Sequence, residues 1–178
     1  QRAPVRVEST RLAEPIPGGY DAVSEYEVRY TYADGTKLTI LTTRDDSIYG
    51  AKINPDGQRN GIRFEGSNGW LWVNRSEIKA SDMELLRTPL PDDATRLYVS
   101  RDHMQNFFDC VRSRAKPICD VETGHLSANM CHLGAISLRT HRALTWDADR
   151  EVFTGEHAAE GNAHLARELR APYDYSFV

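Results

Sequence analysis

The chain has 178 residues, with 22 Lys and Arg against 26 Asp and Glu, so its formal net charge at pH 7 is −4. Charges of both signs are interspersed and form no basic block, which argues against a nucleic-acid-binding protein. No apolar run approaches the roughly 20 residues that a membrane-spanning helix requires.

The first part of the chain has the pattern of β-strands. A short strand is expected over residues 5–8, and the Pro- and Gly-rich segment 14–19 must be a loop. Residues 26–32 alternate large apolar with polar side chains, which is typical of a strand with one aromatic face and one polar face.

The turn after this strand decides which face the next strand buries. A two-residue turn would send the apolar residues that follow to the polar face. A three-residue loop over 33–35, ending in a left-handed glycine, instead pairs Tyr30 with Leu38 and Val28 with Ile40. We therefore predict the three-residue loop.

A second hairpin is expected further along the chain. Strands are predicted over 62–65 and 70–73 around a turn at 66–69, with a third short strand over 77–80. The polar residues 45–60 are expected to form a loop over the sheet edge. Because 70–73 is almost continuously apolar, we expect it to be buried on both faces, by helices and by a partner subunit.

The remaining chain has mainly helical patterns, beginning with a single turn at 83–86. Ser100 is predicted to cap a helix whose apolar stripe packs on the sheet. That stripe consists of Met104, Phe107, Phe108 and Val111. A short strand over 144–146 and a weak helix over 158–167 are expected near the end.

The longest predicted helix covers residues 121–140 and is apolar on two sides. Asp120 is the expected N-cap, and Glu122 places a negative charge at the positive end of the helix dipole. The two sides carry Leu126, Met130 and Leu133, and Ala128, Cys131, Ala135 and Leu138. One side is expected to meet the sheet, and the other a part that this chain does not contain.

Strands gathered first and helices later predict an α+β fold. We expect an open, largely antiparallel β-sheet with helices packed on one face, and the other, aromatic face available for oligomerisation. Residues 1–178 fit one α+β domain. Because the chain opens on Gln1 without a start methionine and enters a strand almost at once, we expect it to be part of a longer protein.

Few residues suggest chemistry. His125, His132 and Arg139 recur at seven-residue spacing on the long helix, and roughly 10 Å between the two histidines is too far for one metal ion. His125 has two interpretations that stay open. Either it lines a pocket and binds a substrate hydroxyl or moves a proton, or it is a structural histidine bonded to backbone or to a carboxylate.

The other candidates favour ordinary roles. His103 and Cys110 are two helical turns apart, which argues against a nucleophile pair. The adjacent carboxylates Asp45 and Asp46 are typical of a solvated loop. The cysteines at 110, 119 and 131 are expected to be buried thiols without a disulfide. The sequence has no G-x-G-x-x-G phosphate loop, so no cofactor-binding residue is assigned. No catalytic or metal-binding residue is assigned either, because none of the candidates above forms a self-sufficient site.

Four blocks of sequence are familiar in type and order: residues 30–38, 61–73, 103–114 and 117–125, followed by Arg170-Ala-Pro-Tyr173. Together they resemble the C-terminal domain of the glucose–fructose oxidoreductase/inositol dehydrogenase/MocA family, in its bacterial branch. The resemblance covers most of the chain and is specific for the family, but it says little about the substrate.

The resemblance implies a two-domain enzyme whose N-terminal Rossmann domain binds NAD or NADP. Such enzymes move a hydride between the nicotinamide and a carbon of a sugar, inositol or related polyol, and they form oligomers through the open sheet. The present chain lacks the dinucleotide fingerprint and the Glu-Lys-Pro segment with its catalytic lysine, so it is expected to be inert alone. Members of this branch are cytoplasmic or exported by a twin-arginine signal.

The resemblance also places Glu122 and His125 near the junction of the two domains, which makes them candidate substrate-binding residues. The alternative is a free-standing module that binds a carbohydrate or a protein through its aromatic sheet face. A hydrolase that uses the chain's own His and Asp residues is the third interpretation.

Overall fold

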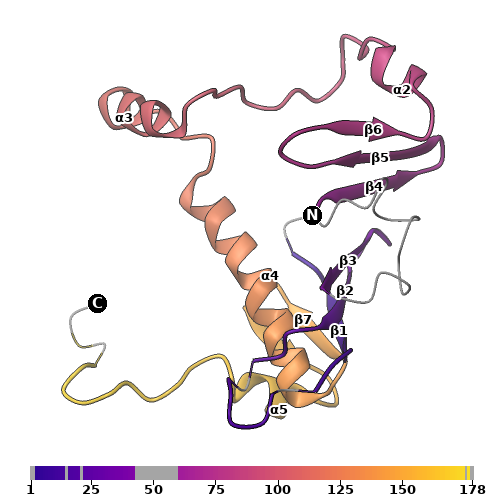
Figure 1. Cartoon of the computed structure of the whole chain (residues 1–178). Coiled ribbons are helices and arrows are strands. Elements are labelled where there is room, and N and C mark those ends of the chain that lie inside the picture. Colours follow the sequence, from indigo (N-terminus) through magenta and orange to yellow (C-terminus); the bar gives the residue numbers. More distant parts are fainter. Residues whose placement is uncertain (1–2, 15, 21, 43–59, 175, 177–178) are drawn as a thin grey trace. The chain divides into compact units, whose positions relative to one another are not determined.

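The structure is a computed structural model that describes residues 3–14, 16–20, 22–42, 60–174 and 176. The chain divides into two compact units, residues 1–43 with 102–178, and residues 44–101 (Figure 1). Each unit is described by itself. The predicted loop over 45–60, apart from its last residue, and the carboxylates Asp45 and Asp46 lie outside the described residues.

The first unit contains an antiparallel sheet in the order β3-β2-β1-β7-β8. Its strands are β1 (Arg6–Arg11), β2 (Tyr26–Thr31), β3 (Lys37–Thr42), β7 (Leu144–Asp147) and β8 (Val152–Thr154). Strand β1 pairs with β2 on one side and with β7 on the other, so a strand from the start of the chain is joined to one from near its end.

The predicted register of the first hairpin is confirmed. Tyr30 lies opposite Leu38 and Val28 opposite Ile40. The loop between them is held by a 2.9 Å hydrogen bond from the Tyr32 N–H to the Thr36 carbonyl, and Gly35 has φ +88°. Glycine enters this left-handed conformation without steric cost, which explains why the three-residue loop is available here.

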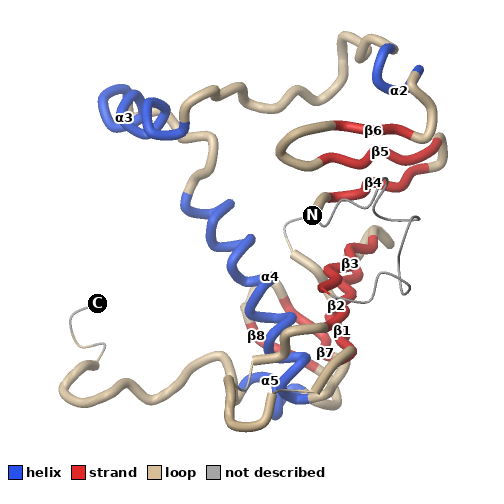
Figure 2. The backbone as a smooth tube through the Cα atoms, viewed as in Figure 1, coloured by secondary structure: helices blue, strands red, loops and turns tan. Residues whose placement is uncertain are grey.

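The long helix α4 (Val121–Thr140) packs on one face of this sheet, as Figures 1 and 2 show. Tyr30 donates its hydroxyl proton to the Met130 carbonyl at 2.7 Å, and the hydroxyls of Ser9 and Ser137 are 2.9 Å apart. Burial of Tyr30 raises the pKa of its phenol well above the usual value. The core of the unit lies between α4 and the sheet.

The expectation that the aromatic face of the sheet is open is therefore wrong. Tyr30 is buried beneath α4, and Tyr26 and Tyr32 pack against the same core. The other face is polar, because residues that alternate with the tyrosines point there. It carries Arg6, Glu8, Thr10, Glu27, Arg29 and Thr31. Apolar burial, not association, decides which face receives the aromatic side chains.

Only the second half of α4 is buried. The buried residues of this helix are Leu133, Gly134, Ile136, Ser137 and Leu138, whereas Val121 is 88% exposed. The helix bounds and the Asp120 cap are as predicted, and the Asp120 carboxylate accepts from the Thr123 N–H at 2.8 Å. Hydrogen bonds from Lys116 and from Thr123 lower the pKa of Asp120 to about 2.

The helix α3 (His103–Ser113) differs from the prediction in its cap and its packing. Asp102, not Ser100, is the N-cap, and its side chain accepts from the Met104 and Gln105 N–H groups. No residue of α3 is buried, and its four stripe residues are about half exposed. The prediction that the stripe packs on the sheet is wrong, because α4 fills the apolar face of the sheet.

Two elements near the end of the first unit differ from the prediction. Strand β8 was not predicted, and α5 (Ala158–Asn162) is shorter than the helix expected over 158–167. The ring of Phe153 in β8 contacts Trp146 of β7 edge to face, with centroids 4.9 Å apart. This aromatic pair is part of the core under α4.

The second unit holds a sheet in the order β4-β5-β6, so the strands form two sheets where one was expected, within the predicted α+β class. Its elements are β4 (Ile62–Gly66), β5 (Gly69–Val73), β6 (Ile78–Ala80) and α2 (Glu84–Arg87). Trp72 is buried, but Ile62, Phe64 and Ile78 are more than half exposed. The residues expected to be buried on both faces, 70–73, are buried at Trp72 and partly buried elsewhere, and their cover by a partner subunit stays a prediction.

Candidate functional site

His125 lies on the exposed first half of α4 and is hydrogen-bonded to a carboxylate. Its Nε2 is 2.5 Å from Oε1 of Glu151, which belongs to the loop between β7 and β8. Both side chains are 49% exposed. The carboxylate partner expected for a structural histidine is thus present, and half of the ring stays accessible from solvent.

Asn129 completes the group that we call the His125 cluster: His125, Asn129 and Glu151. It lies one helical turn after His125, so both side chains project from the same side of α4. Its Nδ2 is 2.9 Å from Nε2 of His125 and 3.4 Å from Oε1 of Glu151. The cluster therefore ties the free half of the helix to the hairpin of β7 and β8.

The backbone of Glu151 is in the left-handed region, with φ +51°. The start of its loop is fixed by Asp147, whose carboxylate accepts from the N–H groups of Asp149 at 3.1 Å and Arg150 at 3.0 Å. A left-handed conformation costs a residue with a Cβ about 1–2 kcal/mol. The loop therefore presents the Glu151 carboxylate from a strained position.

Glu122, the other candidate substrate-binding residue, is exposed in the first turn of α4. The structure thus places both candidates on the half of α4 that extends beyond the sheet, but the contacts described for His125 come from Asn129 and Glu151. Sequence reasoning missed Glu151 because β8 was not predicted. The signal that would have revealed the hairpin is the short run Val152-Phe-Thr154, three residue types favoured in strands, which follows the predicted strand after a few polar residues.

The other sequence candidates do not gather into a site. His132 and Arg139 are exposed on α4, and His103 is exposed at the start of α3. Among the residues that the structure describes, no three His, Cys, Asp or Glu side chains are placed to hold a metal ion. Within the same residues, no helix combines the length and apolar character that a membrane span requires.

The three cysteines are free, as predicted, but they are not buried as predicted. Cys110 is partly buried, and Cys119 and Cys131 are exposed. The reason is that α3, the segment before α4 and one side of α4 face away from the core. Free cysteines are usually among the most buried residues of a protein, which is why burial was expected here.

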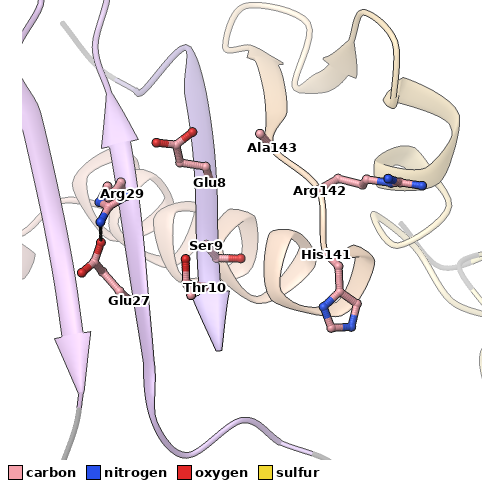
Figure 3. Close-up of a pocket in the computed structure, with 8 residues that line it drawn as sticks. All are labelled: Glu8, Ser9, Thr10, Glu27, Arg29, His141, Arg142 and Ala143. Atoms are coloured by element: carbon pink, nitrogen blue, oxygen red, sulfur yellow. Dashed lines mark ion pairs between the residues drawn. The ribbon is translucent and has the colours of Figure 1, made fainter. Parts of the chain in front are cut away.

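A pocket of about 290 Å³ opens beside β1, on the first unit (Figure 3). It forms where β7 separates from β1 beyond the pair of Val7 and Leu144. Its lining comes from β1, β2 and the connection between α4 and β7: Glu8, Ser9, Thr10, Glu27, Arg29, His141, Arg142 and Ala143. No sequence signal predicted this pocket.

The charges around this pocket are paired within the protein. Glu27 pairs with Arg29, Glu8 with Arg6 at 3.5 Å, and Arg142 with Glu160 at 3.1 Å. The Arg142 guanidinium holds the pKa of Glu160 below its usual value. The carboxylates and guanidinium groups that line the pocket therefore each have an opposite charge beside them.

Comparison with curated proteins gave no match. A family model described as "Oxidoreductase family, C-terminal alpha/beta domain" matches residues 1–175, nearly the whole chain. That span includes both sheets and the His125 cluster, and its description agrees with the mixed fold observed here. The chain belongs to the glucose–fructose oxidoreductase/inositol dehydrogenase/MocA family of oxidoreductases, as its C-terminal α/β domain.

Proposed function

We propose that residues 1–178 form the substrate-cleft and oligomerisation domain of an NAD- or NADP-dependent oxidoreductase. The enzyme transfers a hydride between the nicotinamide and a carbon of a sugar, inositol or related polyol. An N-terminal Rossmann domain binds the nucleotide and carries the catalytic residues, so the present domain is inert alone. The match of the family model over residues 1–175 carries this proposal.

The exposed half of α4 supports a second domain as partner. Val121 is 88% exposed and Ile118, just before the helix, is 42% exposed. Large apolar side chains gathered on a surface usually mark a contact with another domain or chain. Glu122 and His125 lie on this same half of the helix, which puts them beside the proposed cleft.

The second unit supports association between copies of the chain. Ile62, Phe64 and Ile78 are between 53% and 57% exposed. Ile62 and Ile78 both lie opposite Val73 of the central strand, so these side chains share one face of the sheet. An exposed apolar sheet face favours a homo-oligomer in which a second copy covers it.

The proposed division of labour is tested by calorimetric titration of residues 1–178 with NADH and NADPH. We expect no heat of binding at millimolar nucleotide, because the phosphate-binding loop and its helix N-terminus belong to the other domain. Micromolar binding to this chain would overturn the proposal. The longer protein that includes the upstream region is the positive control.

The role of His125 is tested in the longer protein by His125→Ala. Loss of a hydrogen bond to a substrate hydroxyl is expected to lower kcat/KM by about tenfold or more. Steady-state rates with myo-inositol and D-glucose are the measurement. His132→Ala, seven residues along the same helix and also exposed, is the matched control and should leave the rates unchanged. A kcat/KM of His125→Ala equal to that of the native protein would remove His125 from the site.

A further inference from the structure

The short contact in the His125 cluster determines where the imidazole carries its proton. A carboxylate is only a hydrogen-bond acceptor, so the 2.5 Å approach of Glu151 Oε1 requires a proton on Nε2 of His125. In the neutral ring the other nitrogen, Nδ1, then has a lone pair and accepts hydrogen bonds. Within the described part of the chain, no group hydrogen-bonds to Nδ1.

Asn129 holds the carboxylate rather than the ring. The single proton on Nε2 is donated to Glu151, so the amide hydrogens of Asn129 are left with Glu151 Oε1, 3.4 Å away, as acceptor. The carboxylate oxygen thus receives hydrogen bonds from two residues of α4 that are one turn apart. This arrangement fixes the carboxylate against the helix.

The backbone of Glu151 gives an independent observation. At φ +51° a glycine would be the least strained residue, yet the chain has a glutamate. Backbone strain of this kind persists where the surrounding structure enforces it, and it is concentrated at functional sites. The strained residue makes hydrogen bonds to His125, at 2.5 Å, and to Asn129, at 3.4 Å.

We propose that Glu151 is the positioning residue of His125: it holds Nε2 as a donor and thereby presents Nδ1 as the acceptor for a hydroxyl group of the substrate. This inference rests on the proposed function, which places His125 beside the substrate cleft. It assigns Nδ1 as the atom that meets the substrate, and a hydroxyl that donates a proton as the group recognised. Polyols and sugars supply such hydroxyls.

The test of positioning uses the longer protein labelled with 15N-histidine. At low temperature the native protein should show a slowly exchanging Nε2–H proton of His125, assigned by its loss in His125→Ala. Glu151→Gln keeps an acceptor oxygen at the same reach and should retain this signal. Glu151→Gly should lose it while keeping or raising the thermal midpoint of unfolding, because glycine relieves the left-handed strain. An unchanged Nε2–H signal in Glu151→Gly would overturn the proposal and leave the proposed function standing.

Rates with myo-inositol and D-glucose separate the two ideas. If the inference holds, Glu151→Gly lowers kcat/KM by about tenfold, as His125→Ala does, and Glu151→Gln restores most of the rate. If Glu151→Gly loses the Nε2–H signal but neither it nor His125→Ala changes the rate, the substrate role of His125 fails. The presentation of Nδ1 to the substrate fails with it, although the contact itself remains.

Discussion

Replacing Gly134 by alanine is expected to destabilise the first unit by about 1–3 kcal/mol, although alanine is the better helix former. A Cβ at position 134 would lie 2.5 Å from the hydroxyl oxygen of Tyr30 and 3.3 Å from Cγ1 of Val28. Tyr30 cannot move without losing its hydrogen bond to the Met130 carbonyl. The close approach of α4 to β2 therefore depends on the missing side chain.

Gly124 is the matched control, because it lies in the same helix and a Cβ added there would meet no described atom within 4 Å beyond its immediate helical surroundings. Gly124→Ala should stabilise the protein by about 0.5–1 kcal/mol through helix propensity. Urea unfolding followed by circular dichroism measures both variants. Adding Tyr30→Phe should recover part of the loss caused by Gly134→Ala, since it removes the clashing oxygen. If both glycine substitutions shift the midpoint in the same direction, the packing of α4 described above is wrong.

Replacing Asn162 by aspartate is expected to destabilise the protein by about 2–3 kcal/mol at neutral pH, although the two side chains have the same shape. The Asn162 amide bonds both backbone groups of Phe153: Oδ1 accepts from its N–H at 2.8 Å, and Nδ2 donates to its carbonyl at 3.0 Å. A carboxylate keeps the first bond, loses the second and places a negative charge beside the carbonyl oxygen.

The pH dependence identifies this cause. The carbonyl beside it raises the pKa of the new carboxyl in the folded state, and protonation restores a donor. The difference from the native protein should therefore narrow as the pH falls towards about 4, the pKa of the unfolded chain, and stay constant below it. Asn68→Asp, in the exposed turn between β4 and β5, is the control and should stay within about 0.5 kcal/mol of the native protein. A constant difference at all pH values would contradict the bidentate contact. Thermal unfolding at several pH values is the measurement.

Local patterns in the sequence determined the elements that depend on near neighbours. The alternation from Tyr26 to Tyr32 and the glycine at position 35 specify a strand, a loop length and a register, because turn geometry and side-chain period act within a few residues. Asp120 and the apolar pattern after it determined the bounds of α4 for the same reason. The order of strands and helices was enough for the fold class.

Burial was predictable only in part. The stripe of α3 has a core-like spacing yet is about half exposed, and the predicted open aromatic face lies beneath α4. A periodic pattern shows that a side is apolar, but it does not identify what covers that side. The helices α3 and α4 both carry apolar sides that could cover the sheet. The second half of α4 occupies that face, and which helix does so is decided only when the elements pack.

The candidate site was also predictable only in part from the sequence. The sequence by itself determined that His125 stands on a helix with an acidic first turn, and that the chain has the motifs of an oxidoreductase C-terminal domain. Only the tertiary structure decided that Glu151, 26 residues away, is the partner of His125. That contact requires β8 to pair with β7 and the hairpin loop to turn back to α4. Hydrogen bonds between distant segments depend on the packing of whole elements, which no local pattern encodes.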